Sequence, residues 1–276
     1  MTRGGGSSSQ HDSVSDAIED RAEDYAKRLD SSDIAETDSL NDLDIVIEAL
    51  LDDSALLIRG RYSNKLRFGS VYEQVSNVGP DDEPWSMRKP LIAGLIAAEV
   101  EFRGPLRLSP TQNALLASQF ETLGAALARS ELPAHAVRAW TGAMELYRRA
   151  HDSAAEDRCG LELARARRAT MAPGWERGVS MAADLLCGYG YRPFRLLGWV
   201  VVQIALCTGI ALLSAGTRSS TDVVYLAVLT FLNPLDPNNV TGMEPQAKVL
   251  FAVEACLGAV SMSVFFALLV RRWFRL

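Results

Sequence analysis

The sequence is poor in the residues that usually build catalytic and metal sites. It has three histidines and four cysteines in 276 residues, and neither type is spaced as a set of metal ligands. No C-x-x-C pair and no G-x-S-x-G, Walker or H-E-x-x-H pattern occurs. We therefore expect a protein that is not an enzyme, holds no cofactor or metal, and uses reduced cysteines as small hydrophobic residues.

Basic residues are scarce in the first part of the chain. Residues 1–57 hold 15 Asp or Glu and 4 Lys or Arg, a net charge of −11; because the whole chain carries −6, residues 58–276 carry +5. Nucleic acid is not an expected partner, since its phosphates require a basic surface. Residues 1–12 are polar and rich in Gly and Ser, without the apolar run of a signal peptide, and predict a flexible tail.

Long apolar runs are confined to the C-terminal third. Residues 196–214 contain no charged side chain, and residues 249–270 contain only Glu254. As helices, both are long enough to cross a hydrocarbon core of about 30 Å. They predict a hairpin of two transmembrane helices, with the lipid bilayer as a partner.

The basic residues around these runs predict a topology. Five arginines lie outside the two runs, namely Arg192, Arg195, Arg271, Arg272 and Arg275, whereas the connecting residues 215–248 contain only Arg218 and Lys248. Cytoplasmic segments carry the excess of Lys and Arg. We expect a multi-pass protein of the inner cell membrane with both termini in the cytosol.

Between the runs lies a third apolar segment that is too short to span. Residues 221–232 predict a helix that begins at Thr221 and Asp222 and ends before Asn233-Pro234-Leu235-Asp236-Pro237. Irregular backbone at membrane depth occurs only where protein buries it or a water-filled cavity faces it. The order of span, half-helix, loop and span is typical of a pore.

Three stretches of residues 187–275 resemble the two-transmembrane, pore-loop (potassium-channel-like) family in its bacterial form. They are Gly188-Tyr189-Gly190-Tyr191-Arg192-Pro193, then Tyr225 with Thr230-Phe231, and Val253-Glu254-Ala255-Cys256-Leu257-Gly258. The resemblance implies a homo-oligomeric ion channel, with four copies around the pore and permeant ions as ligands. It also implies a filter at Thr230, Phe231, Leu232, Asn233, Pro234 and Asp236, and a gate or hinge at Gly258 and Ser261.

The filter segment departs from the family pattern, which is Thr-x-Gly-Tyr/Phe-Gly-Asp. Asn233-Pro234-Leu235-Asp236-Pro237-Asn238 contains no glycine, and its two prolines fix φ near −65°. Such a backbone cannot form the ladder of inward carbonyls that replaces the hydration shell of potassium. Either Asn233 and Asp236 form polar rings in a wide, weakly cation-preferring pore, or the segment is an ordinary turn in a hairpin that does not conduct.

Glu254 also has two interpretations. An ionisable residue inside a span is a functional candidate by default. Alternatively, its carboxyl is a structural group near the outer end of the helix, hydrogen-bonded behind the re-entrant segment.

Residues 13–190 predict a cytosolic helical domain. Val14, Ile18, Tyr25 and Leu29 share one face of a first helix. A second helix is expected over 40–58, with a capping box at Ser39 and Asp42, and a third over 91–102. The three histidines, His11, His135 and His151, fall in the tail and at two helix junctions.

Residues 109–171 contain the clearest unit of this domain. Ser109-Pro110 predicts a helix start, and helices are expected over 110–129, 133–150 and 154–171. Seven positions within residues 117–150 resemble a single tetratricopeptide repeat, namely Phe120, Leu123, Gly124, Leu127, Ala136, Trp140 and Ala143. The small residues let paired helices approach and the large ones fill the gap; a plain helical bundle is the alternative.

Two functions remain at this point. The first is an oligomeric channel with poor potassium selectivity, gated or assembled by the helical domain. The second is a non-conducting, membrane-anchored scaffold whose tetratricopeptide-like domain recruits protein or peptide partners.

Overall fold

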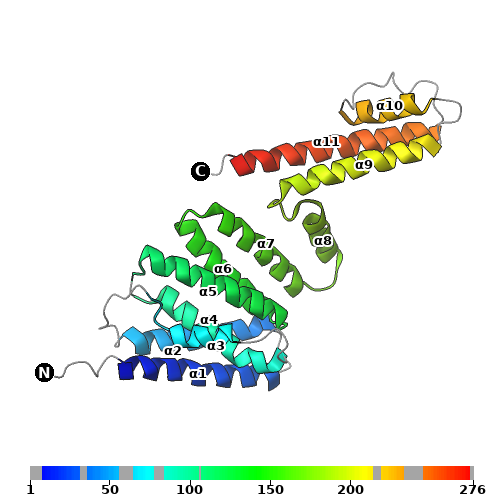
Figure 1. The fold of residues 1–276 in the computed structure, drawn as a ribbon. Helices are drawn as coiled ribbons and strands as arrows, with labels where there is room; N and C mark the ends of the chain where they lie inside the picture. Colours follow the sequence, from blue (N-terminus) through cyan, green and yellow to red (C-terminus); the bar gives the residue numbers. More distant parts are fainter. Residues whose placement is uncertain are drawn as a thin grey trace. The chain divides into compact units, whose positions relative to one another are not determined.

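The computed structural model describes residues 8–31, 36–55, 65–77, 84–105, 107–213, 219–232 and 245–273. Every regular element in these ranges is an α-helix, which confirms the predicted all-α class (Figure 1). The helices are α1 (Ser8–Ser31), α2 (Glu36–Ala55), α3 (Gly69–Ser76), α4 (Pro84–Arg103), α5 (Pro110–Arg129), α6 (Pro133–Arg149), α7 (Ser153–Thr170), α8 (Trp175–Cys187), α9 (Pro193–Leu213), α10 (Ser220–Leu232) and α11 (Pro245–Trp273).

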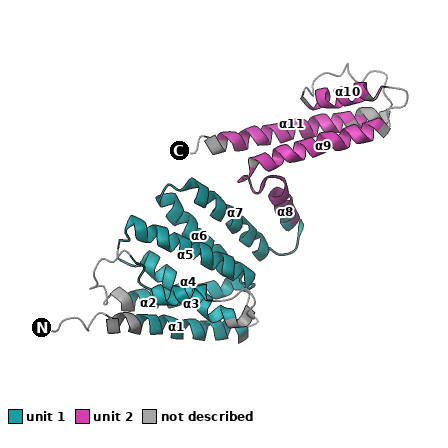
Figure 2. Cartoon of the chain, in the orientation of Figure 1, with its two compact units in different colours: residues 1–177 teal, residues 178–276 magenta. Residues whose placement is uncertain are grey.

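The chain divides into two compact units (Figure 2). Unit 1 is Met1–Arg177 and unit 2 is Gly178–Leu276. The boundary lies before α8 has completed its first turn, whereas the sequence predicted it after Gly190. Within unit 2, α8 is joined to α9 by a hydrogen bond in which Trp199 Nε1 donates to the Leu185 carbonyl oxygen at 3.0 Å.

Unit 1 is built around α4. All residues from Leu91 to Val100 are buried, and α4 contacts α1, α2, α3 and α5. A helix that is apolar on all sides must be covered on all sides. The segment predicted as a helix over 91–102 is therefore the centre of the domain, and it begins earlier than predicted, at Pro84.

The first helix has the predicted buried face but not the predicted start. Val14, Ile18 and Tyr25 are buried, and Leu29 packs against the same core. However, α1 begins at Ser8, so residues 8–12 are helical and do not belong to the predicted tail. The polar run from Ser8 to Asp12 contains neither Gly nor Pro, so no helix-breaking residue stops α1 there.

The capping box predicted at Ser39 is wrong. Helix α2 begins at Glu36, so Ser39 lies within its first turn, and its hydroxyl donates to the Glu36 carbonyl oxygen at 2.6 Å. A serine inside a helix commonly bonds back to a carbonyl of the preceding turn. The Ser39 carbonyl in turn accepts from the Tyr25 hydroxyl at 2.9 Å, which links α2 to α1.

Helices α5, α6 and α7 follow the predicted boundaries closely and pack as consecutive neighbours. Ser109 caps α5: its hydroxyl accepts from Gln112 N at 3.2 Å, and Ser109 N donates to Gln112 Oε1 at 2.9 Å. Gly124 provides the close approach that the sequence predicted. A Cβ atom there would lie 2.7 Å from the Trp140 ring, so only glycine fits.

Unit 2 contains α8 to α11. Helices α9, α10 and α11 contact one another in all three pairs, and we call this group the apolar hairpin. Its helices match the three predicted apolar segments, and α10 begins one residue before Thr221. The sequence predicted these elements from length and composition alone.

Candidate functional site

Helices α9 and α11 are long and apolar enough to span a membrane. The apolar stretches are Phe194–Leu212 and Phe251–Val270, and only 28% and 17% of them are buried within the chain. A core helix of a soluble domain would be mostly covered. Instead the two helices expose large apolar side chains, among them Val201, Leu206, Ile210, Val253, Val260 and Val264.

Helix α10 lies against both long helices by a single face. Val223, Ala227 and Phe231 are buried, and their spacing of four residues places them on one side of the helix. Tyr225, on another face, is 66% exposed. At 13 residues, α10 is about 20 Å long and cannot cross a bilayer.

Helix α10 approaches α11 closely at Gly258. A Cβ atom at Gly258 would lie 2.9 Å from Phe231 Cδ2 and 3.1 Å from the Phe231 carbonyl oxygen. The absent side chain thus makes room for both the ring and the backbone of α10. Helix α11 continues unbroken through Gly258 and through Ser261, which is partly buried. The structure gives Gly258 a packing role, and a hinge there stays a prediction.

Glu254 is the charged residue enclosed by the apolar hairpin. Its side chain is completely buried, and among the described residues neither carboxylate oxygen has a hydrogen-bond partner. Its neighbour Phe251 is buried on the same helix. The hydrogen bond expected behind the re-entrant segment is therefore not made within the described part of the chain. Within the described ranges, Nε2 of Gln203 in α9 is also buried without a hydrogen-bond partner.

Three of the six residues of the predicted filter lie in the described part of the chain, at the end of α10. Thr230 is half-buried and Phe231 is buried, both in the last turn of α10. Leu232 ends that helix, and its side chain is outside the described set. Asn233, Pro234 and Asp236 lie outside the described residues. The described site thus consists of the end of α10, Gly258 and Glu254.

Unit 1 contains a polar cluster that sequence reasoning missed. His135, fully buried in α6, has Nε2 at 2.8 Å from the Tyr25 hydroxyl and Nδ1 at 2.7 Å from Glu36 Oε1. The Glu36 carboxylate also accepts from Ala134 N at 2.9 Å and from His135 N at 3.0 Å. It thereby caps α6, whose own N-cap residue, Leu132, offers no side-chain oxygen. Burial raises the pKa of Tyr25 to about 12.

A second polar cluster surrounds Arg138 on the same helix. Arg138 Nε donates to Glu99 Oε1 at 3.0 Å, and Nη2 donates to Asp44 Oδ1 at 2.6 Å. Although burial opposes the charge of Arg138, its bonds to Asp44 and Glu99 raise the pKa of the guanidinium. The pKa of Asp44 is lowered, chiefly by the hydrogen bond from Arg138.

A third polar cluster surrounds the buried carboxyl of Glu101. This carboxyl accepts hydrogen bonds from Arg67 N at 2.7 Å and from the Tyr72 hydroxyl at 3.1 Å. Burial raises the pKa of Glu101 and holds that of Tyr72 well above its ordinary value. In all three clusters the polar atoms are used to join helices. No sequence pattern predicted these hydrogen-bonded pairs, because the two residues of each pair are far apart in the chain.

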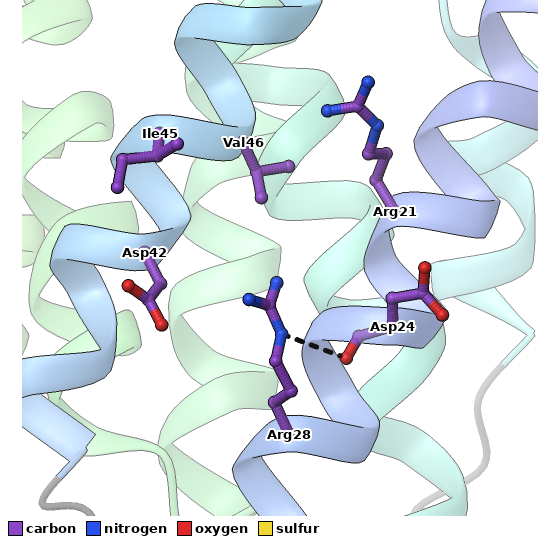
Figure 3. A pocket seen from close by; sticks show the side chains of 6 residues that line it. All are labelled: Arg21, Asp24, Arg28, Asp42, Ile45 and Val46. Atoms are coloured by element: carbon purple, nitrogen blue, oxygen red, sulfur yellow. Dashed lines mark hydrogen bonds between the residues drawn. The ribbon is translucent and has the colours of Figure 1, made fainter.

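The described surface of unit 1 has a shallow pocket of about 220 Å³ between α1 and α2 (Figure 3). Its lining residues are Arg21, Asp24, Arg28, Asp42, Ile45 and Val46. Arg28 Nε donates to the Asp24 carbonyl oxygen at 3.4 Å, so one wall is held by α1 itself. Within the described ranges, no group of three or more His, Cys, Asp or Glu is arranged to hold a metal ion.

Comparison of this chain with protein-family models, with curated proteins and with solved structures found no match. The function is therefore argued from the residues and their geometry.

Proposed function

We propose that the protein is an oligomeric membrane channel of the pore-loop type, with α9 and α11 as its two spans. The observation that carries the proposal is the docking of α10 on α11. A helix too short to span lies between two that are long enough, and its last turn is fitted to Gly258 through Phe231. This arrangement holds the last turn of α10 against the second span, as a re-entrant segment requires.

The exposed faces of the hairpin support assembly. Two helices cannot enclose an aqueous path, so a pore requires several copies around an axis. Exposed small residues on α11, such as Ala259 and Ser263, allow helices of neighbouring copies to approach. The resemblance to the pore-loop family favours four copies, with permeant ions as the ligands.

The loop after α10 gives this channel a different selectivity from a potassium channel. Pro234 and Pro237 exclude the alternating backbone of a carbonyl filter. Asn233 and Asp236 of each copy instead present amide and carboxylate groups to the path. We expect a wide pore with a weak preference for cations.

Both termini are assigned to the cytosolic side of the inner membrane. The arginines that lie just outside the two spans outnumber the basic residues between the spans, and cytoplasmic segments carry the excess of such residues. Unit 1 then lies inside the cell, where it assembles or gates the pore. The contact of Gly124 with Trp140 supports a tetratricopeptide-like arrangement of α5 and α6, since that repeat places a small residue against a large one.

A scaffold that does not conduct is the second candidate. The loop without glycine favours it, as does the repeat-like packing of α5 to α7, a type of surface that binds peptides or proteins. In this case the hairpin serves as an anchor.

Recording from the purified protein in planar bilayers distinguishes the two. The channel predicts currents whose cation preference falls in Asp236→Asn, most at low salt, where screening is weak. The matched control is Asp222→Asn, which removes the same charge at the opposite end of α10 and should leave selectivity unchanged. Equal effects of both changes would remove Asp236 from the path. Silent wild-type protein that still binds a partner through unit 1 would favour the scaffold.

A further inference from the structure

Helix α8 has an apolar face that the described residues leave exposed. Trp175, Val179 and Leu186 are 78%, 58% and 41% exposed, and none of the residues in α8 is buried. With about 100° per residue, these three side chains and Ala182 fall on one side of the helix. The opposite side carries Arg177, Ser180 and Asp184. A short helix so clearly divided requires an apolar partner on one side and water on the other.

The turn that follows α8 joins it firmly to the first apolar helix. Gly188, Tyr189 and Gly190 all have positive φ, and Arg192 N donates to the Cys187 carbonyl oxygen at 3.1 Å. The polar side of α8 is fastened as well, since Ser180 Oγ lies 2.7 Å from the Tyr189 hydroxyl. Helix α8 and the start of α9 are therefore one connected element.

The position of Trp199 sets the depth of α8. Trp199 lies in the second turn of α9, and its indole Nε1 donates to the Leu185 carbonyl oxygen. Tryptophan near the end of a span lies at the level of the lipid headgroups. The C-terminal end of α8 is thereby fixed at that same level. With 13 residues, α8 is too short to cross the bilayer itself.

We propose that α8 lies in the cytoplasmic headgroup region of the bilayer, with the face of Trp175, Val179, Ala182 and Leu186 inserted among the lipid chains. The occupant of the apolar face is thus phospholipid, and not a second copy or another protein. Amphipathic helices with Trp and Leu on one face bind membranes in this way. The exposed Arg177 and Arg192 add attraction to anionic lipid headgroups. The proposal rests on the proposed function in taking α9 as a membrane span with its first residues on the cytoplasmic side.

Spin labels on the full chain in phosphatidylcholine–phosphatidylglycerol vesicles test it. Val179→Cys and Arg177→Cys are two residues apart, so their labels point about 160° away from each other on the helix. Leu206→Cys on α9, where the native side chain is 62% exposed, lies about 10 Å deeper than Trp199 and reports whether the span is in lipid. The other cysteines are replaced in all three variants.

The proposal predicts that the label at residue 179 is relaxed by oxygen and shielded from a water-soluble nickel complex, and that the label at residue 177 shows the reverse. Strong exposure of both labels to nickel would overturn it, with the face in water. A label at residue 179 shielded from both reagents would also overturn it, because protein would then cover the face. If the label at residue 206 is also open to nickel, the membrane span itself fails, which separates the two claims.

Tryptophan fluorescence provides a second test in a chain that keeps its native cysteines. It therefore does not depend on whether the cysteine-free variants fold correctly. The difference in fluorescence between wild type and Trp175→Phe isolates Trp175. We expect lipids brominated near the headgroup to quench it several-fold more than acrylamide does. Quenching by acrylamide alone, or by neither reagent, would contradict insertion into lipid.

Discussion

Gly258→Val tests whether α10 is held against α11 as the structure has it. The ideal Cβ atom lies 2.9 Å and 3.0 Å from two carbons of the Phe231 ring and 3.1 Å from the Phe231 carbonyl oxygen. Carbon atoms prefer a separation of about 3.5–4.0 Å. The ring can turn aside, but the carbonyl is backbone, so α10 as a whole must move. Overpacking of this kind costs about 1–3 kcal/mol.

Gly209→Val provides the matched control. Gly209 is in α9, and a Cβ atom there would meet nothing within 4 Å. Both changes alter helix propensity equally and slightly in favour of the helix, by roughly 0.3 kcal/mol. We therefore expect Gly209→Val to leave stability within about 0.5 kcal/mol of wild type.

The assay is reversible unfolding of the full chain in mixed micelles, titrated with sodium dodecyl sulfate. Gly258→Val should shift the midpoint to lower detergent fraction, and Gly209→Val should not. Adding Phe231→Ala to Gly258→Val should not restore the wild-type midpoint, because the substitution removes the ring and leaves the Phe231 carbonyl oxygen in place. Equal midpoints for the two glycine variants would refute the docking.

Three further predictions concern unit 1. Gly124→Val should destabilise this unit by about 1–3 kcal/mol in thermal unfolding, because the new Cβ atom meets the Trp140 ring; an unchanged melting temperature would contradict the packing. Glu36→Ala should cost about 2–4 kcal/mol through the lost cap of α6, against less than about 0.5 kcal/mol for the exposed Asp38→Ala, and equal losses would refute the cap. Burial raises the pKa of Glu101 above its ordinary value of 4.5, so the folded state holds this proton more tightly than the unfolded chain. The stabilisation that comes from the Glu101 proton is complete below pH 4.5 and is lost as the pH rises through the raised pKa. The melting temperature should therefore vary less with pH in Glu101→Gln than in wild type, and an equal or larger variation would contradict this.

Local patterns predicted the elements that local physics determines. The start of α5 follows from Ser109 and Pro110, whose hydroxyl and missing N–H suit a helix start wherever they occur. The three apolar helices of unit 2 follow from length and composition. The close approach of a neighbouring helix at Gly124 was also expected, although the sequence did not pair this residue with Trp140.

The errors arose where a residue is used by a distant part of the chain. The motif at Ser39 has the form of a capping box, yet α2 begins earlier, at Glu36, whose carboxylate caps α6 across 98 residues of sequence. No window of sequence around Ser39 contains that partner. The short helix α3 was missed because only Val71, Tyr72 and Val75 are buried on it, too few to form a period.

The candidate site was foreseen in position but not in contacts. Gly258 was singled out as a hinge, and the structure shows it as the seat of Phe231. One of the two interpretations of Glu254 had its carboxyl hydrogen-bonded, and this carboxyl is buried without a partner among the described residues. The contacts of Gly258 and Glu254 both depend on which face of α10 packs against the other two helices. Three neighbouring helices of apolar composition do not reveal that face from sequence alone.

The central claim, a two-span hairpin with both termini in the cytosol, is tested most directly by cysteine labelling. A membrane-impermeant maleimide is added to intact cells carrying Thr217→Cys, Met243→Cys or Arg177→Cys in a chain without other cysteines. We predict labelling at positions 217 and 243 before permeabilisation, and at 177 only afterwards. Labelling of 177 in intact cells, or of 217 and 243 only after permeabilisation, would contradict the hairpin and its orientation.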